Sequence, residues 1–137
     1  MSGVVQEWFL SDGSTLSAEE QGYLWNVPLM VASGEGIGSE APKLVMMDQK
    51  TLKIEGVAAG GGAVLLNAGQ QSLFRVNYGE ALLTRLATQL DDLTAIDRAS
   101  LISDNLALAK AGKVPIDQVG PLFAGLFVFW SACCCCS

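Results

Sequence analysis

The sequence predicts a small antiparallel β-sandwich followed by two or three α-helices that begin an incomplete helical domain. Short apolar runs separated by turn residues fill the chain to about residue 78. From Glu80 onward the apolar residues recur at helical spacing. Half of the 137 residues are hydrophobic, which is enough to bury a core. A single twisted sheet is the alternative to the sandwich.

Two apolar runs predict the first strands. Residues 4–10 form one run, which ends at the turn cluster 11–14. Residues 23–33 form the second run, in which alternate positions are apolar, as in a half-buried strand: Trp25, Val27, Leu29 and Val31. Pro28 has no N–H to donate, so the second strand should be an edge strand or carry a bulge at that point.

Four shorter segments complete the predicted strand set, at residues 43–47, 50–55, 63–68 and 73–78. In the last segment Phe74, Val76 and Tyr78 share one face, and polar residues stand between them. The glycine-rich segment 56–62 predicts a plain loop, because it lacks the lysine and the hydroxyl residue of a phosphate-binding loop.

The rest of the chain reads as helices. The first is predicted from Glu80, with an apolar face made of Leu82, Leu83, Leu86 and Leu90. The second is predicted at roughly residues 95–111, with a core-facing stripe made of Ala95, Ala99, Ile102, Leu106 and Ala109. Gly112 and Pro115 end it, and a third helix should begin near Ile116. Two or three helices cannot bury both faces of each helix. We therefore expect more helices in the complete molecule.

The composition excludes several classes of function. The formal net charge is −6 and the eight basic residues are scattered, whereas nucleic-acid binding needs a basic footprint. The chain contains no histidine, which excludes a histidine-based zinc site, a Ser-His-Asp triad and a Cys-His dyad within it. We therefore assign no catalytic, metal-binding or substrate-binding residue.

The two ends of the chain carry few signals. No basic segment followed by a long apolar run opens the sequence, so no signal peptide is recognised, and a cytoplasmic setting is favoured. Cys133, Cys134, Cys135 and Cys136 are adjacent, which fits neither a structural zinc site nor a disulfide framework. Two interpretations of this tail are open: acylated cysteines that anchor a helix to a membrane, and an end that is not native sequence, which we prefer.

Three segments, W-N-V-P-L at residues 25–29, R-V-N-Y at 75–78 and D-R-A-S-L-I-S-D at 97–104, resemble motifs of the aminopeptidase N family of zinc metallopeptidases. Residues 25–29, W-N-V-P-L, are similar to the family's W-x-V-P-L strand. Residues 75–78, R-V-N-Y, match the end of a longer family motif, although Ser72 and Leu73 stand where the family has Gly-Tyr. Residues 97–104, D-R-A-S-L-I-S-D, resemble D-R-A-x-L-I-x-D, and Asn105 follows in place of the usual Ala. The motifs keep the family's order over roughly residues 5–120.

The resemblance implies a domain organisation and a parent protein. It implies a fibronectin-like β-sandwich domain at residues 4–78, the first helices of a truncated helical domain at 79–126, and an atypical apolar and cysteine-rich tail at 127–137. The parent would be a zinc-dependent aminopeptidase. Its H-E-x-x-H zinc motif and G-A-M-E-N substrate loop belong to a catalytic domain outside this chain. Zinc is therefore expected in that domain, and the catalytic and remaining helical domains are the expected partners.

Seven motif residues are candidates for structural roles: Trp25, Pro28, Arg75, Tyr78, Asp97, Arg98 and Asp104. Arg75 and Tyr78 could form a recognition pair, but a salt bridge and a packed, hydrogen-bonded tyrosine are preferred. Asp97, Arg98 and Asp104 could form an acid-base set, but capping and pairing between helices explain them as well; Asp97 lies in the first helical turn, where it complements the helix dipole. Trp8 and Trp25 are expected to pack in the core or between domains rather than to form an exposed platform.

Two functional hypotheses follow. The first is a non-catalytic structural fragment of a zinc aminopeptidase that removes N-terminal residues from peptides, in which this part scaffolds the catalytic and helical domains. The second is a free-standing protein-interaction module that uses its exposed helical face, since large exposed apolar patches usually mark partners.

Overall fold

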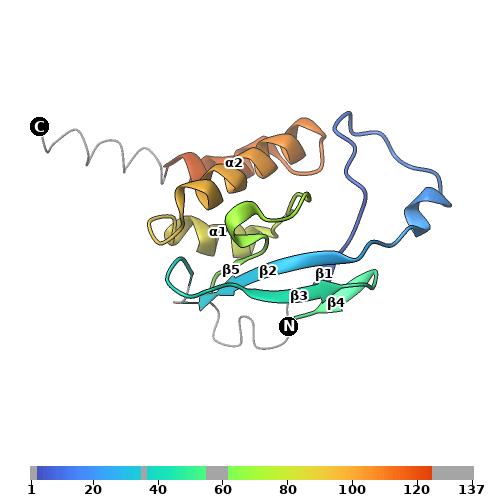
Figure 1. Cartoon of the computed structure of the whole chain (residues 1–137). Helices are drawn as coiled ribbons and strands as arrows, with labels where there is room; N and C mark the ends of the chain where they lie inside the picture. The colour runs from blue at the N-terminus through green and yellow to red at the C-terminus, as the bar shows by residue number, and fades with distance from the viewer. Residues whose placement is uncertain (1–2, 35–36, 55–61, 125–137) are drawn as a thin grey trace, which may run out of the picture.

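The computed structural model describes residues 3–34, 37–54 and 62–124, which form two small antiparallel sheets with helices packed over one side (Figure 1). One sheet pairs β1 (Gly3–Val5) with β4 (Thr51–Lys53). In the other sheet β2 (Val27–Ser33) lies between β3 (Lys43–Met47) and β5 (Val64–Leu65). Two 3-10 helices, η1 (Glu20–Gly22) and η3 (Ala68–Gln70), lie in the loops.

The two sheets pack against each other through a small apolar core. Its buried members are Leu29, Val31, Met47 and Val64, all from the three-stranded sheet. Val4 of β1 and Leu52 of β4 pack against them from the other sheet. The fold is therefore the predicted small sandwich, and the alternative of a single sheet is not supported.

The helices follow as predicted and share a larger core with the sheet. α1 spans Glu80–Thr88, α2 spans Ala95–Lys110, the 3-10 helix η4 spans Ile116–Val119, and residues 120–124 are helical. The buried cluster joins strand and loop residues, such as Leu65 and Tyr78, to helix residues, such as Leu86 and Leu101. This cluster spans the predicted boundary at residues 78 and 79.

Several strand bounds differ from the prediction. The strand expected at residues 4–10 is only Gly3–Val5, and the strand expected at 23–33 begins at Val27. The strand at 43–47 is confirmed, and the segment at 50–55 contains the shorter β4. Most of the predicted loop 56–62, the end of the 50–55 segment and the tail 127–137 lie outside the described residues.

Residues 73–78 do not form the predicted strand. Phe74 is half-buried, Val76 and Tyr78 are buried, and the polar residues between them are exposed, so the alternation is real. No strand pairs with this segment in the described part of the chain. The Val76 N–H instead donates to a carboxylate of Asp104 on α2. A side chain thus takes the place of a neighbouring strand, which the alternating pattern cannot reveal.

The predicted core-facing stripe of α2 is wrong. Ala95, Ala99 and Leu106 are exposed, and the other two stripe residues are half-buried. The helix instead buries Asp97, Leu101, Asp104, Asn105 and Leu108. Polar residues can occupy a buried face when they find hydrogen-bond partners there, so counting apolar positions selected the opposite face.

Pro28 lies at a strand end that has a partner on one side only. It pairs with Met46 in an unbroken antiparallel register, so the predicted bulge is absent. β5 reaches only Ala32 and Ser33 on the other side of β2. Near Pro28 that side is met by the Ser72 hydroxyl, which donates to the Pro28 carbonyl at 2.9 Å. Of the two predicted alternatives, an edge strand or a bulge, the structure therefore shows a local edge at Pro28.

Candidate functional site

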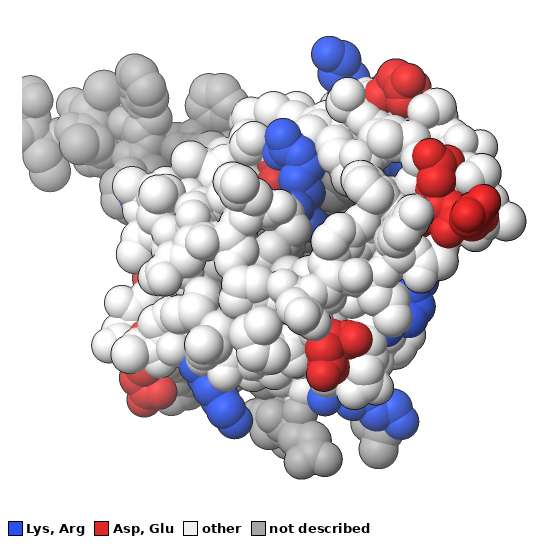
Figure 2. Space-filling view, turned by 45° about the vertical axis from the view of Figure 1, so that its right-hand side comes forward, with Lys and Arg blue, Asp and Glu red and all other residues white. Residues whose placement is uncertain are grey.

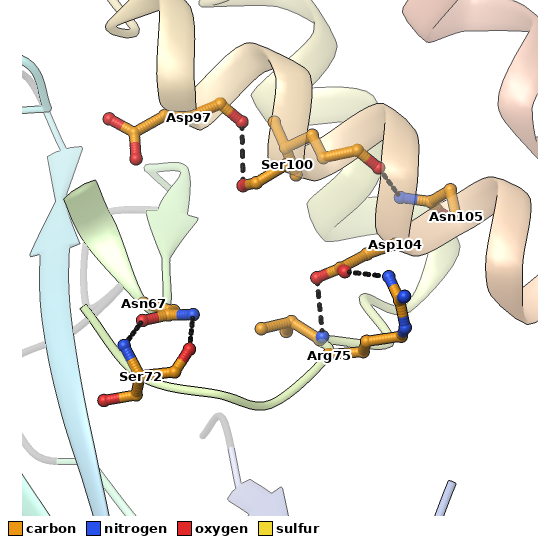
Figure 3. Close-up of polar contacts among 9 residues, drawn as sticks. Asn67, Ser72, Arg75, Asp97, Ser100, Asp104 and Asn105 are labelled. Carbon is orange, nitrogen blue, oxygen red and sulfur yellow. Dashed lines mark hydrogen bonds and ion pairs between the residues drawn. The ribbon is translucent and has the colours of Figure 1, made fainter. Parts of the chain in front are cut away.

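The candidate site is the contact between α2 and the extended segment before α1, residues 66–78, which we call the junction loop. The Asp104 carboxylate makes two contacts with this loop (Figure 3). One carboxylate oxygen accepts the Val76 N–H at 3.0 Å, and the other pairs with the Arg75 guanidinium at 3.0 Å. Burial raises the pKa of the Asp104 carboxyl, although the Val76 N–H and Arg75 act in the opposite direction. Arg75 also lies over the ring of Phe9, 5.5 Å from its centroid, which ties the N-terminal segment to the site.

Asp97 makes a second link, in the first turn of α2. It is buried, and one of its oxygens accepts the Gly69 N–H of the junction loop at 2.7 Å. Its own N–H donates to the hydroxyl of Thr94, the N-cap residue, and that hydroxyl donates to the carboxylate in return. Asp97 therefore orients the Thr94 cap of its helix and holds the loop at the same time.

The junction loop is also closed by its own side chains. Asn67, which has a left-handed backbone (φ 59°), is almost fully buried. Its side-chain amide donates to the Ser72 carbonyl at 2.8 Å and accepts the Ser72 N–H at 2.9 Å, the paired bonds visible in Figure 3. Sequence reasoning missed this role for Asn67; an asparagine before Ala-Gly in a loop is the signal that could have revealed it, since asparagine tolerates the left-handed conformation.

Tyr78 anchors the other end of the loop to the sheet. Its hydroxyl accepts the Leu66 N–H at 2.8 Å, and burial raises the pKa of this phenol well above its usual range. The Gln118 side chain donates to the Tyr78 carbonyl at 3.4 Å. The tyrosine therefore connects the two ends of the junction loop, next to β5, and joins them to η4.

The remaining candidate residues lie near the same junction or at the N-terminal segment. The Arg98 guanidinium donates to the Leu90 carbonyl at 3.2 Å and so joins α2 to the end of α1. Trp25 is half-buried and meets Trp8 edge to face, with ring centroids 4.5 Å apart. Trp8 is 45% exposed, so it does not lie in the core of this chain, and its packing between domains stays a prediction. The buried Gln6 side chain fixes this pair by bonding both the N–H and the carbonyl of Trp25.

The family departures have different structural consequences. Ser72 forms the hydrogen bonds that close the junction loop, whereas Leu73 is fully exposed. Asn105 is 0% exposed, and its amide donates to the Leu101 carbonyl at 2.8 Å. Its side-chain oxygen has no hydrogen-bond partner among the described residues.

The residues of this site form a structural connection between α2 and the junction loop, which we call the joint. Within the described ranges every carboxylate of the junction accepts hydrogen bonds that hold backbone or arginine in place. No group of three or more potential metal ligands occurs in the same ranges, and the whole sequence has no histidine. The residues present do not fit the zinc site that the resemblance implies for the parent.

No described helix is long and apolar enough to cross a membrane. On the face drawn in Figure 2 the basic side chains are dispersed among uncharged residues.

Comparisons with known proteins bear on the origin of this joint. A family model, the ERAP1-like C-terminal domain, matches residues 63–128, which include the junction loop and both α-helices. Puromycin-sensitive aminopeptidase of Caenorhabditis elegans is 32% identical over 137 residues, which is 94% of this chain and 14% of that protein. Aminopeptidase N of Homo sapiens is 31% identical over 117 residues, which is 81% of this chain and 12% of that protein.

The chain belongs to the aminopeptidase N family. The thyrotropin-releasing hormone-degrading ectoenzyme of Homo sapiens is a further relative, 29% identical over 121 residues, 82% of this chain and 11% of that protein. The chain thus spans only about one eighth of the length of the curated relatives it matches, between 11% and 14%. The part that the ERAP1-like model shares with this chain, residues 63–128, contains the junction loop, α1 and α2.

Proposed function

We propose that this chain is a non-catalytic structural part of an aminopeptidase that removes N-terminal residues from peptides. Its role is to scaffold the catalytic and helical domains by fixing the sandwich relative to the first helices. The zinc ion and the groups that act on the peptide would belong to the catalytic domain of such an enzyme. The partners are then the remaining domains of the same enzyme.

The observation that carries the proposal is the pair of buried aspartates on α2. A buried carboxylate costs several kcal/mol unless hydrogen bonds compensate it, on the order of 2–7 kcal/mol even for a neutral polar group. Asp97 and Asp104 both meet this cost with backbone N–H groups from the junction loop. Such bonds fix a geometry more strictly than apolar contacts do, because donor and acceptor must be aligned. A rigid joint is what a scaffold between two domains needs.

The proposal keeps the division of the chain at residues 78 and 79. The sandwich would extend over 4–78, the first helices over 79–126, and the atypical tail over 127–137. The junction loop precedes α1, so it is the segment through which one part would position the other.

A chimera tests the proposed function. The matched segment of the Caenorhabditis elegans relative is replaced by this chain, and hydrolysis of an aminoacyl-anilide is measured with and without a metal chelator. We expect chelator-sensitive hydrolysis by the chimera and none by the isolated chain. Hydrolysis by the isolated chain, abolished by the chelator, would overturn the non-catalytic assignment, and a chimera that does not fold would overturn the scaffold.

Two variants of the chimera address the joint itself. Asp104→Leu removes the acceptor for Val76 and Arg75, and should shorten the half-life of thermal inactivation while leaving the KM of the folded enzyme unchanged. Asp117→Leu, at an exposed aspartate of η4, is the matched control and should behave like the unmodified chimera. Equal half-lives for the two variants would show that the joint contributes nothing.

The second candidate function, a protein-interaction module, is favoured by one observation. Ile96 and Leu106 of α2 and Ile116 and Phe123 beyond it are large apolar residues that remain exposed. A helical face of this kind fits a groove on another protein. Concentration-dependent binding of a hydrophobic dye that Leu106→Lys abolishes would support it; a monomeric, cooperatively folding chain without dye binding would count against it.

A further inference from the structure

The three-stranded sheet is apolar on both faces, not only on the face that packs in the sandwich. Residues directly opposite each other in an antiparallel pair project to the same side, with Cβ atoms about 5 Å apart. Pro28 lies opposite Met46, and Met30 lies opposite Leu44. These four side chains alternate with the sandwich-core positions, so they share the opposite face. We call them the strand patch. Antiparallel sheets commonly alternate apolar and polar residues when one face meets water.

One half of this outer face is already covered by the helical layer. Ala32 and Leu65 form the next cross-strand pair along β2, and both are buried in the cluster that contains Leu86 of α1. Met30 is half-buried and packs against the same cluster. The strand patch therefore continues, without interruption along β2, the surface on which α1 and the junction loop sit.

The other half is open. Leu44 is 56% exposed and Met46 is 50% exposed, and Pro28 beside them is exposed too. Single exposed apolar residues are normal on a protein surface, but a contiguous block on one sheet face indicates a contact site. β3 begins with the exposed Lys43, and a lysine on an edge strand disfavours edge pairing with a second copy of this chain.

We propose that the strand patch is a docking surface for an apolar element from another domain of the same aminopeptidase polypeptide. This inference rests on the proposed function. Two facts select this occupant over a second copy: the patch continues an interface that helices already cover, and the matched segment is only 14% of the length of the Caenorhabditis elegans relative. Inter-domain contacts of this type bury roughly 600–1,500 Å², of which the patch would form one part.

The test compares one pair of substitutions in two settings. Leu44→Thr with Met46→Thr removes the apolar surface but keeps β-branched residues that suit a strand. The pair is introduced into the isolated chain and into the chimera described above, and Leu24→Thr, at a leucine of similar exposure outside the patch, is the control. Thermal unfolding is followed for the isolated chain, and thermal inactivation for the chimera.

We expect the double substitution to leave the isolated chain's midpoint unchanged and to shorten the half-life of the chimera roughly tenfold, equivalent to about 1.4 kcal/mol. Leu24→Thr should change neither. Equal effects in both settings, or none in the chimera, would overturn the docking surface while the active chimera upheld the proposed function. A chimera that fails to fold without any substitution would remove the proposed function and this inference together. Sedimentation completes the test: a dimeric chain that the double substitution converts to a monomer would assign the patch to a second copy and overturn the inference.

Discussion

The turn between β2 and β3 contacts the turn between α1 and α2 through Gly38, and an alanine at this position should destabilise the protein strongly. A Cβ built on Gly38 would lie 1.7 Å from the Asp92 carbonyl oxygen and 2.9 Å from the carbonyl carbon. Both atoms are backbone, so no side chain can rotate away. Gly38 also has a φ of +80°, which disfavours any residue with a Cβ.

A comparison with Gly112 separates the cost of the positive φ from the cost of the close contact with Asp92. It has a similar φ of +68°, and no atom lies within 4 Å of its Cβ position. Gly112→Ala should therefore cost only the left-handed conformation, about 1–2 kcal/mol. Gly38→Ala adds overpacking, which costs about 1–3 kcal/mol more. The expected total for Gly38→Ala is about 2–5 kcal/mol, a large fraction of a typical stability of about 5–15 kcal/mol.

Urea unfolding of the isolated chain, followed by circular dichroism, measures both variants. We expect the slope of the unfolding free energy against urea concentration to be unchanged in both variants. The urea midpoint should be modestly lower for Gly112→Ala and much lower for Gly38→Ala. A Gly38→Ala variant that is unfolded without urea, beside a folded Gly112→Ala, would agree with the larger cost. If the two variants lose the same free energy of unfolding, the close contact between the two turns does not exist.

Three further predictions concern the junction. Tyr78→Phe leaves the Leu66 N–H without its acceptor and should cost about 1–3 kcal/mol of unfolding free energy, whereas Tyr23→Phe, at an exposed tyrosine, should cost nothing measurable by urea titration. Asn105→Leu, which keeps a similar side-chain volume, removes a buried oxygen that has no described partner and should be neutral or stabilising; a loss above about 2 kcal/mol would show that the amide is satisfied after all. Because burial raises the pKa of Asp104, the native state holds this proton more tightly than the unfolded chain does. That contribution to stability is complete below the carboxyl's ordinary pKa and is lost as pH rises through the higher native pKa. The free energy of unfolding of the wild type minus that of Asp104→Asn should therefore decrease as pH rises through the mildly acidic range, and a difference that increases would contradict the direction of the shift.

The elements that the sequence predicted well are those in which a local pattern and tertiary burial agree. The strand at residues 43–47 has the predicted bounds, and α2 begins at Ala95 as predicted. The leucine face predicted for the first helix is correct, since Leu83 and Leu86 of α1 and Leu90 just after it are buried. Thr94 and Gly112, on either side of α2, supply a cap and a stop that act locally, so they can be recognised without the rest of the structure.

The failures share a physical cause. The segment before α1 alternates like a strand, but its backbone is held by Asp104, 28 residues further along the chain. The buried face of α2 carries Asp97 and Asp104, and both carboxylates accept N–H groups from that distant segment. Hydrophobic periodicity treats each segment alone, so it cannot recognise a polar residue whose partner lies elsewhere. The same pairing explains both errors, in the junction loop and in the helix face.

The two apolar faces of β2 explain why this arrangement needs both a second sheet and a helical layer. One face, with Leu29 and Val31, would meet water without β1 and β4. The other, with Ala32, would meet water without α1. Neither cover reaches the end of β2 near Pro28, where the outer face remains open. A strand that is apolar on both sides is typical of the middle layer of a larger structure. The open end of β2 is therefore where the rest of an aminopeptidase would be expected to make contact.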